Sequence, residues 1–243
     1  MLLVIDIGNT STVFAFYENE TLVKSLRTKT GDYDEKTMKN IPYSIEAAAA
    51  SSVVPEVNSQ ISEIIYSVFG CQVKFIDGLK DCGLSICTDY PERVGADIIC
   101  GAAAAFSKYN SAVIVFDLGT ATTVCAVDSS GRYLGHSISP GIKTSFSALH
   151  HYTALLPEIT DDFVCEEVIG KNTVSSMKSG VLLGAACFID GMSLRYKEAI
   201  GGEAVVVVTG GMAAEVLSYC REKCIYHENL LLEGIRVIYN RGL

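Results

Sequence analysis

Two short turns in the sequence carry a carboxylate where an apolar strand ends. The first lies in "VIDIGNTST" (4–12), where Asp6 is followed by Gly8, and the second in "VFDLGTATTVCAV" (115–127), where Asp117 is followed by Gly119. Glycine lets the backbone approach a ligand closely, and successive N–H groups in a turn bind phosphate oxygens. A carboxylate repels phosphate, so it fits best as a ligand of a bridging cation such as Mg²⁺. The pattern predicts two phosphate-binding loops.

The alternative is structural, because Asp-x-Gly also shapes ordinary hairpins. The two turns, however, occupy matching points of an internal repeat. Asp6 and Asp117 stand 111 residues apart. At the same offset Gly8 matches Gly119, Thr12 matches Thr123, Val13 matches Val124 and Ala15 matches Ala126. A repeated unit that keeps both turns favours the phosphate interpretation.

Each copy of the repeat reads as a strand, a turn, two further strands and a helix. The expected strands are 2–7, 11–17 and 21–28 in the first copy and 112–117, 121–127 and 132–139 in the second. Pro140 should begin a helix in the second copy. We therefore expect an α/β protein of two duplicated domains, 1–108 and 109–243, with a nucleotide cleft between them.

Other segments complete the two copies. The segment 29–42 is polar and turn-rich, a strand should end before Pro55, and helical spacing continues to a stop at Gly70. Further helices are expected at 95–109, 171–197 and 228–240, and "VVVVTGG" (205–211) forms a third glycine turn after a buried strand. The third turn could meet the nucleoside end of a ligand or simply join a strand to a helix.

Composition narrows the functional classes. The chain has 243 residues, 49% of them hydrophobic, and a net charge of −9, so a broad nucleic-acid surface is disfavoured. The nine cysteines include no CxxC pair and the four histidines offer no zinc-finger spacing. Free thiols and the lack of a signal-peptide pattern favour a cytoplasmic protein. The most apolar stretch, "MKSGVLLGAACFIDGMSL", carries Lys178 and Asp190, which favours a packed helix over a membrane span.

The chain resembles a known family along nearly its whole length. The repeat is similar to the RNase H-like (actin-like ATPase) domains shared by actin, hexokinase and Hsp70. Within that fold the details resemble the bacterial type III pantothenate kinases. The resemblance rests on "DIGNT", "SSVVP", "YPERVGAD", "DLGTATT", "YLGHSISPGI", "ALHHYTALLP", "GKNTVSSMKSGVLLGA", "VVVTGG" and "LLLEGIRVIY", in this order.

The resemblance implies an ATP-dependent kinase that phosphorylates pantothenate in the first step of coenzyme A biosynthesis, with Mg²⁺ and with K⁺ or NH₄⁺. It implies a homodimer in which Thr173 acts across the interface. Asp6 would lie near Mg²⁺, Asp117 would bind K⁺, and Asp97 would be the catalytic base. The residues implied for ATP are Asp6, Ile7, Gly8, Asn9, Thr10, Ser11, Thr12, Val13 and Thr120; those implied for pantothenate are Tyr90, Gly95, Ala96, Asp97, Ile98 and Thr173.

The residue types support the role of Asp97 without requiring it. Phosphoryl transfer to an alcohol needs a carboxylate placed to accept the hydroxyl proton, and cations that neutralise the phosphates. Asp97 falls in the first turn of an expected helix, where a carboxylate also suits the helix dipole. The residues alone leave both interpretations open.

The chain departs from the family pattern on the acceptor side. Ile98 replaces the arginine that usually follows the aspartate, Gly101 replaces an asparagine, His136 replaces a glycine, and Met212 replaces an aspartate. Three hypotheses follow: a pantothenate kinase, a kinase for another small hydroxylated acceptor, or a catalytically weak nucleotide-binding paralogue with a regulatory role. A dinucleotide oxidoreductase is disfavoured because no Gly-x-Gly-x-x-Gly follows a strand and opens a helix.

Overall fold

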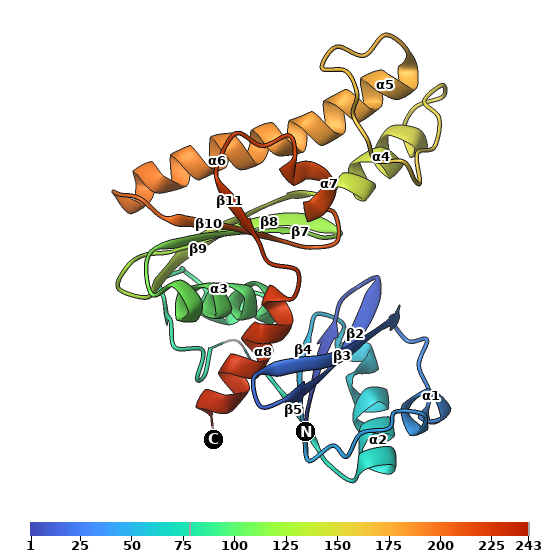
Figure 1. Cartoon of the computed structure of the whole chain (residues 1–243), viewed down its shortest axis with the longest axis vertical. Coiled ribbons are helices and arrows are strands. Elements are labelled where there is room, and N and C mark those ends of the chain that lie inside the picture. Colours follow the sequence, from blue (N-terminus) through green and yellow to red (C-terminus); the bar gives the residue numbers. More distant parts are fainter. Residues whose placement is uncertain (78, 243) are drawn as a thin grey trace. The chain divides into compact units, whose positions relative to one another are not determined.

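The computed structural model describes residues 1–77 and 79–242, which form a mixed α/β protein with two sheets. The chain divides into two compact units. The first comprises Met1–Ala104 and Asn229–Leu243, and the second comprises Ala105–Glu228. The last helix therefore belongs to the first unit, and the division differs from the expected 1–108 and 109–243. The physical reason is that this helix packs on the first sheet (Figure 1).

The first unit is built on a sheet in the order β3-β2-β1-β4-β5. β1, β2 and β3 are antiparallel neighbours, while β4 and β5 continue from β1 in parallel. The bounds are β1 Leu2–Ile7, β2 Ser11–Glu18, β3 Thr21–Lys29, β4 Ala47–Ser52 and β5 Val73–Phe75. The short strand β6 Ser85–Ile86 is not part of this sheet. The helical segments are α1 Glu35–Lys39, η1 Pro55–Val57, α2 Asn58–Phe69, η2 Pro91–Arg93, α3 Ala96–Tyr109 and α8 Leu230–Arg241.

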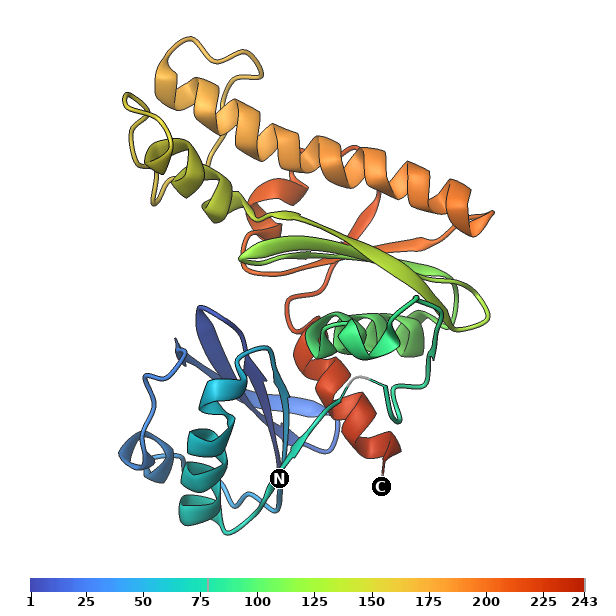
Figure 2. The same cartoon turned by 180° about the vertical axis from the view of Figure 1, so that it is seen from behind.

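Strand alternation decides which way Asp6 points. Leu3, Ile5 and Ile7 are buried in a core that also holds Ile61 and Ile65 of α2. Figure 2 shows α2 on this side of the first sheet. Successive strand side chains point to opposite faces of a sheet, so Asp6 lies on the other face. The helix α8 packs there against β1 and β4.

The second unit carries strands in the order β11-β10-β7-β8-β9. This order matches that of the first unit when the first sheet is taken from its other edge, as β5-β4-β1-β2-β3. β7, β8 and β9 are antiparallel, and β10 and β11 continue from β7 in parallel. The bounds are β7 Val113–Leu118, β8 Ala121–Val127, β9 Arg132–Pro140, β10 Val205–Thr209 and β11 Cys224–Tyr226. The helices are α4 Ile142–His151, α5 Thr173–Lys178, a π-helical turn Ser179–Leu183, α6 Gly184–Ile200 and α7 Ala213–Leu217.

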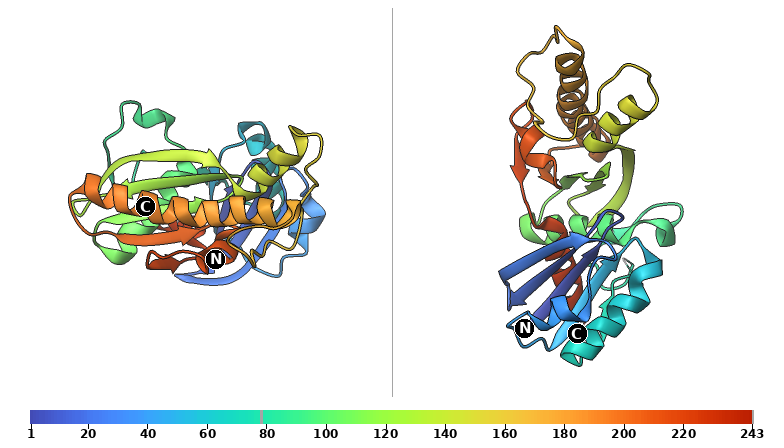
Figure 3. Two further views of the ribbon diagram at one scale, coloured as in Figure 1. Left: turned by 90° about the horizontal axis from the view of Figure 1, so that it is seen from above. Right: turned by 90° about the vertical axis from the view of Figure 1, so that its right-hand side faces the viewer.

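A long helix covers one face of the second sheet (Figure 3, left). Leu182, Ala186 and Ile189 pack into the core with Ile114 and Phe116 of β7. Thr173–Ile200 is the one helix among residues 1–77 and 79–242 that is long and apolar enough to cross a membrane. In its most apolar window 28% is buried, and the large apolar side chains of this helix that are exposed are Val174 and Leu194.

The structure corrects three details of the expected elements. Pro140 ends β9 instead of beginning a helix, because Gly141 is extended (ψ 166°) as the N-cap of α4. The turn-rich segment 29–42 contains α1, whose first turn is capped by the Asp34 carboxylate accepting from Thr37 N at 2.7 Å. The expected offset of 111 residues between the two copies also does not hold for strand pairing after the acidic turns. Thr12 pairs with Ile7, but Thr122, not Thr123, pairs with Leu118, because β7 and β8 are joined by one residue fewer than β1 and β2.

Candidate active site

The first acidic turn joins β1 to β2 and is held by hydrogen bonds to its own backbone. Gly8 N donates to Ser11 O at 3.1 Å, and a β-carbon at Gly8 would stand 3.2 Å from the same oxygen. Thr30, which directly follows β3, braces the turn because its Oγ1 donates to Gly8 O at 2.5 Å. Nothing in the sequence around Thr30 indicated this role. These hydrogen bonds hold the backbone of the turn in place.

The eight residues expected to line the ATP phosphates divide into two groups. The side chains of Ile7, Thr12 and Val13 are buried, so these residues can meet a ligand only through backbone atoms. Asn9 and Thr10 are exposed, and Asp6, Gly8 and Ser11 are partly exposed. The accessible polar groups therefore gather at the tip of the hairpin.

Asp97 opens α3 close to Gly95. Its Oδ1 accepts from Ile98 N at 2.8 Å, and a β-carbon at Gly95 would collide with the same carboxylate oxygen. The glycine thus leaves the space that the carboxylate occupies. Ala96, Asp97 and Ile98 are all partly exposed, so the carboxylate is accessible to an acceptor. Tyr90 lies just before this turn and is 59% exposed.

Asp6 and Asp97 both act on one buried thiol, that of Cys100. Burial raises the pKa of Cys100 well above its usual range, and the charges of Asp6 and then Asp97 raise it further. Cys100 lies one turn after Asp97 on α3, and Asp6 faces this side of the first sheet. The first unit therefore brings the expected Mg²⁺ ligand and the expected base to the same region, although they are 91 residues apart in the sequence.

The second acidic turn is closely packed by the start of α4. Thr120 O accepts from Gly141 N at 3.1 Å and from Thr144 Oγ1 at 2.6 Å. A β-carbon at Gly141 would collide with the carbonyl oxygens of Gly119 and Thr120. The Thr120 side chain remains exposed. The Pro140–Gly141 pair therefore has a structural reason: only glycine permits the helix to begin against the turn.

The third glycine turn lies against the second acidic turn. Gly210 has φ +98°, and a β-carbon there would stand 2.5 Å from Asp117 Oδ1. Thr209 pairs with Asp117 across β10 and β7, and Met212 N donates to Leu118 O at 3.2 Å. The sequence predicted a turn at 209–211 but not its contact with Asp117. Asp117, Thr120 and the Gly210 turn thus form one surface of the second unit.

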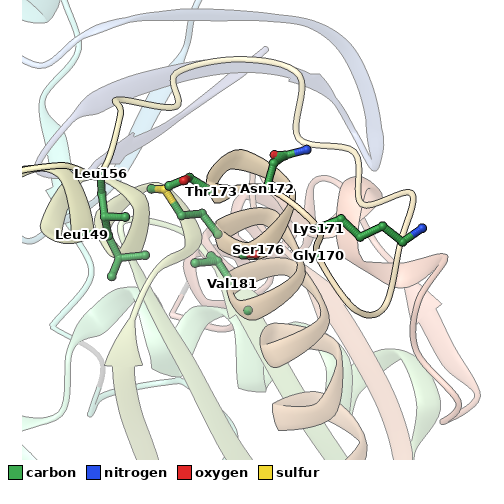
Figure 4. A pocket seen from close by; sticks show the side chains of 10 residues that line it. Leu149, Leu156, Gly170, Lys171, Asn172, Thr173, Ser176 and Val181 are labelled. Carbon is green, nitrogen blue, oxygen red and sulfur yellow. The ribbon is translucent and has the colours of Figure 1, made fainter.

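Thr173 lines a pocket of the second unit with a volume of about 710 Å³. Thr173 begins α5, and the preceding Asn172 caps the helix by accepting from Ser175 N at 2.9 Å. The pocket has apolar side chains from Leu149 and Leu156 together with polar groups from the start of α5 (Figure 4). It can therefore hold a small molecule that has both apolar and polar parts.

Two of the departures from the family pattern have structural explanations. Met212 is 3% exposed and belongs to the core of the second unit, so its side chain cannot contact a ligand directly. His136 lies in β9 with its Nδ1 2.9 Å from the hydroxyl of the fully buried Tyr133. Ile98 remains the departure that bears on the acceptor, because it directly follows Asp97.

The oxygen atoms at the two acidic turns suit cations that bind together with phosphate. In the part of the chain that the structure describes, no group of three or more His, Cys, Asp or Glu side chains could hold a metal ion. Mg²⁺ is usually bound through one or two carboxylates, water and substrate phosphates. Asp6 beside a glycine turn fits that mode. The Asp117 surface adds hydroxyl and carbonyl oxygens, which are the ligands of hard cations.

Comparisons with known proteins identify the family. The family model described as type III pantothenate kinase matches residues 2–195. The type III pantothenate kinase of Syntrophus aciditrophicus is 38% identical over 256 residues, and all of both chains is covered. That of Myxococcus xanthus is 37% identical over 255 residues, covering 100% of this chain and 99% of the relative.

Solved structures show the fold alone, because their identities are low. A Baf family protein of Campylobacter jejuni is 21% identical with a TM-score of 0.61, covering 99% of this chain and 100% of that one. The activator of 2-hydroxyisocaproyl-CoA dehydratase from Clostridium difficile, with bound ADPNP, is 13% identical with a TM-score of 0.51, covering 99% and 94%. These likenesses concern a mixed α/β fold with two sheets. From the family model and the full-length relatives we conclude that the chain belongs to the type III pantothenate kinase family.

Proposed function

We propose that the protein transfers the terminal phosphoryl group of ATP to the primary hydroxyl of pantothenate, giving 4′-phosphopantothenate for coenzyme A biosynthesis. Family membership over the whole chain supports this activity. The structural observation that carries it is the partly exposed Asp97 at the start of α3, with Asp6 near enough to Cys100 of the same helix to raise the pKa of that thiol. A kinase needs the metal that binds the phosphates and the base that takes the acceptor proton in one place.

We propose that Asp6 holds Mg²⁺ and that the tip of the first hairpin binds phosphate oxygens. Thr30 and Ser11 hold the backbone of the turn through hydrogen bonds to Gly8. Preorganised donors cost little reorganisation when charge develops during transfer. When bound, the metal ion neutralises phosphate charge and orients the transferred group.

We propose that Asp117 binds K⁺ or NH₄⁺ and that Thr120 contacts ATP. The support is the packing of Gly210 on the Asp117 carboxylate and the crowding of Gly141 on the turn. These two contacts fix the carboxylate and the Thr120 carbonyl in place. A fixed set of oxygen ligands can distinguish cations by size, which a mobile side chain cannot.

We propose that Asp97 accepts the hydroxyl proton of pantothenate. The carboxylate Oδ1 accepts from Ile98 N, and the Asp97 side chain is partly exposed at the start of α3. Removal of a positioned base typically lowers the rate about 10²- to 10⁴-fold. Tyr90, Gly95, Ala96 and Ile98 surround this group in sequence and would contact the acceptor.

We propose that the protein acts in the cytoplasm as a homodimer in which Thr173 approaches the partner's acceptor site. The support is family membership, the exposed Val174 and Leu194 of Thr173–Ile200, and the pocket that Thr173 lines. Light scattering at micromolar concentration tests the assembly. A mass of two chains supports the dimer, and a mass of one chain contradicts it.

The alternative is a nucleotide-binding paralogue with little catalysis, and Ile98 is the feature that favours it. The test is direct: incubate the protein with ATP, Mg²⁺, K⁺ and pantothenate and look for phosphopantothenate by mass spectrometry. Its formation supports the kinase. Tight ATP binding without any product supports the regulatory paralogue.

A further inference from the structure

Pantothenate presents a charge problem that the expected site does not solve. It is an anion, with the reacting hydroxyl at one end and a carboxylate at the other. The protein has a net charge of −9, and the acceptor turn itself contributes Asp97. A cation near this turn would offset the repulsion. The residue that follows Asp97 is Ile98, whose side chain has no charge.

A cation does lie in the segment that leads into Asp97. The guanidinium carbon of Arg93 stands 4.8 Å from the centre of the Tyr90 ring. Both residues belong to the turn around η2, in which Arg93 N donates to Tyr90 O at 3.0 Å. The next residue, Val94, is 9% exposed and donates from its N to Pro91 O at 3.2 Å. The turn is therefore anchored directly before Gly95.

This arrangement suits the recognition of a carboxylate. A guanidinium that stacks on an aromatic ring keeps the N–H groups at its edge available, and these match the two oxygens of a carboxylate. The stacking also restricts the arginine side chain, so that less entropy is lost when an anion binds. Both side chains are accessible: Tyr90 is 59% exposed and Arg93 is also exposed.

The spacing also fits the substrate. Arg93 precedes Asp97 by four positions, so their Cα atoms lie within about 14 Å of each other. Pantothenate is an open chain, and its carboxylate must be bound at some distance from the hydroxyl that meets the base. A cation four residues before the base meets that need without contacting the base.

We infer that Arg93, held on the Tyr90 ring, binds the carboxylate of pantothenate. It thereby supplies the positive charge that Ile98 does not. This inference rests on the proposed function. It makes Arg93 a specificity-determining residue, since an acceptor with the same hydroxyl end but no carboxylate would gain nothing from it.

The test compares pantothenate with pantothenyl alcohol, in which a hydroxymethyl group replaces the carboxylate. Arg93→Gln should raise the KM for pantothenate roughly 10- to 100-fold, the effect of losing a charge-assisted pair. The same variant should change the KM for pantothenyl alcohol less than about threefold, and kcat should stay within about twofold for both. Arg93→Lys keeps the charge but loses the planar guanidinium, so its KM for pantothenate should lie between those of the wild type and Arg93→Gln.

A matched control and a rescue sharpen the result. Arg221→Gln removes the same charge from an exposed arginine of the second unit and should leave both KM values unchanged. Adding Ile98→Arg to Arg93→Gln should recover at least part of the pantothenate KM, because the charge returns beside Asp97. Unchanged melting of each variant by circular dichroism shows that the fold is intact.

The outcomes separate the inference from the proposed function. The inference is overturned if the wild-type protein phosphorylates pantothenate and Arg93→Gln raises the KM values for pantothenate and pantothenyl alcohol equally, or raises neither. Arg93 would then not bind the carboxylate. If the wild type phosphorylates neither compound but binds ATP, the proposed function itself fails. A selective loss for pantothenate supports both.

Discussion

Gly210 packs on Asp117 so closely that a β-carbon at position 210 would stand 2.5 Å from the carboxylate Oδ1. The glycine also has φ +98°, a conformation that residues with a β-carbon rarely adopt. One backbone position thus fixes the carboxylate that we assign to the monovalent cation. The contact joins two turns that are 93 residues apart in the sequence.

Gly210→Ala should therefore lower the free energy of unfolding by about 2–4 kcal/mol, through backbone strain and crowding against Asp117. Gly211→Ala is the matched control, because a β-carbon at Gly211 meets nothing within 4 Å, and it should change stability by less than about 1 kcal/mol. Urea unfolding of both variants measures the difference. Equal stability of the two would contradict the assigned contact.

Asp117→Asn should weaken the response to K⁺ more than it disturbs the fold. The amide keeps the size of the side chain but removes the charge that attracts the cation. We expect wild-type turnover to rise with K⁺ or NH₄⁺ relative to Na⁺, and the variant to lose most of that rise. Initial rates at constant ionic strength check this. Identical wild-type rates in sodium and potassium would remove the cation role.

Asp97→Asn should abolish turnover while ATP binding stays nearly unchanged. Asp97 lies outside both acidic turns, so its loss affects the acceptor proton and not the phosphates. We expect a fall in kcat of about 10²- to 10⁴-fold. Isothermal titration with a non-hydrolysable ATP analogue gives the affinity separately. A variant that keeps its rate would show that another group takes the proton.

The helix α8 supports Asp97 through a close contact. A β-carbon at Gly234 of α8 would collide with the backbone of Cys100 on α3, one turn after the base. Gly234→Ala should therefore displace α3, lowering both stability, by about 1–3 kcal/mol, and kcat. Gly191→Ala on α6, where a β-carbon meets nothing within 4 Å, should instead stabilise by up to about 1 kcal/mol. If Gly234→Ala behaves like Gly191→Ala, α8 does not position the base.

Most of the local structure could be predicted from the sequence. Pairs of apolar runs around a glycine turn predicted both acidic hairpins, and Gly70 ended α2 as expected with φ 73° and a bond from its N to Tyr66 O. These features depend on neighbouring residues. The resemblance to the family was equally local, since its motifs are short stretches that lie in the expected order, and the family is confirmed by full-length relatives.

Long-range packing could not be predicted in the same way. Nothing near Leu230 indicates that α8 returns to the first unit, because its apolar face would suit either sheet. The approach of Gly210 to Asp117, and of Asp6 and Asp97 to Cys100, also joins segments distant in the sequence. The pairing of Leu118 with Thr122 instead of Thr123 could not be predicted, because the spacing of matching residues does not give the length of the turn between the strands. The roles of the site residues remain predictions.

The most direct test of the whole account is the stoichiometry of a single reaction. Purified protein with ATP, Mg²⁺ and K⁺ is mixed with pantothenate, and ADP and phosphopantothenate are quantified over the same time course. The account predicts that both form in equal amounts, that ADP release depends on pantothenate, and that Asp97→Asn stops both. ADP release that is independent of pantothenate, or ATP binding with no phosphopantothenate, would contradict it.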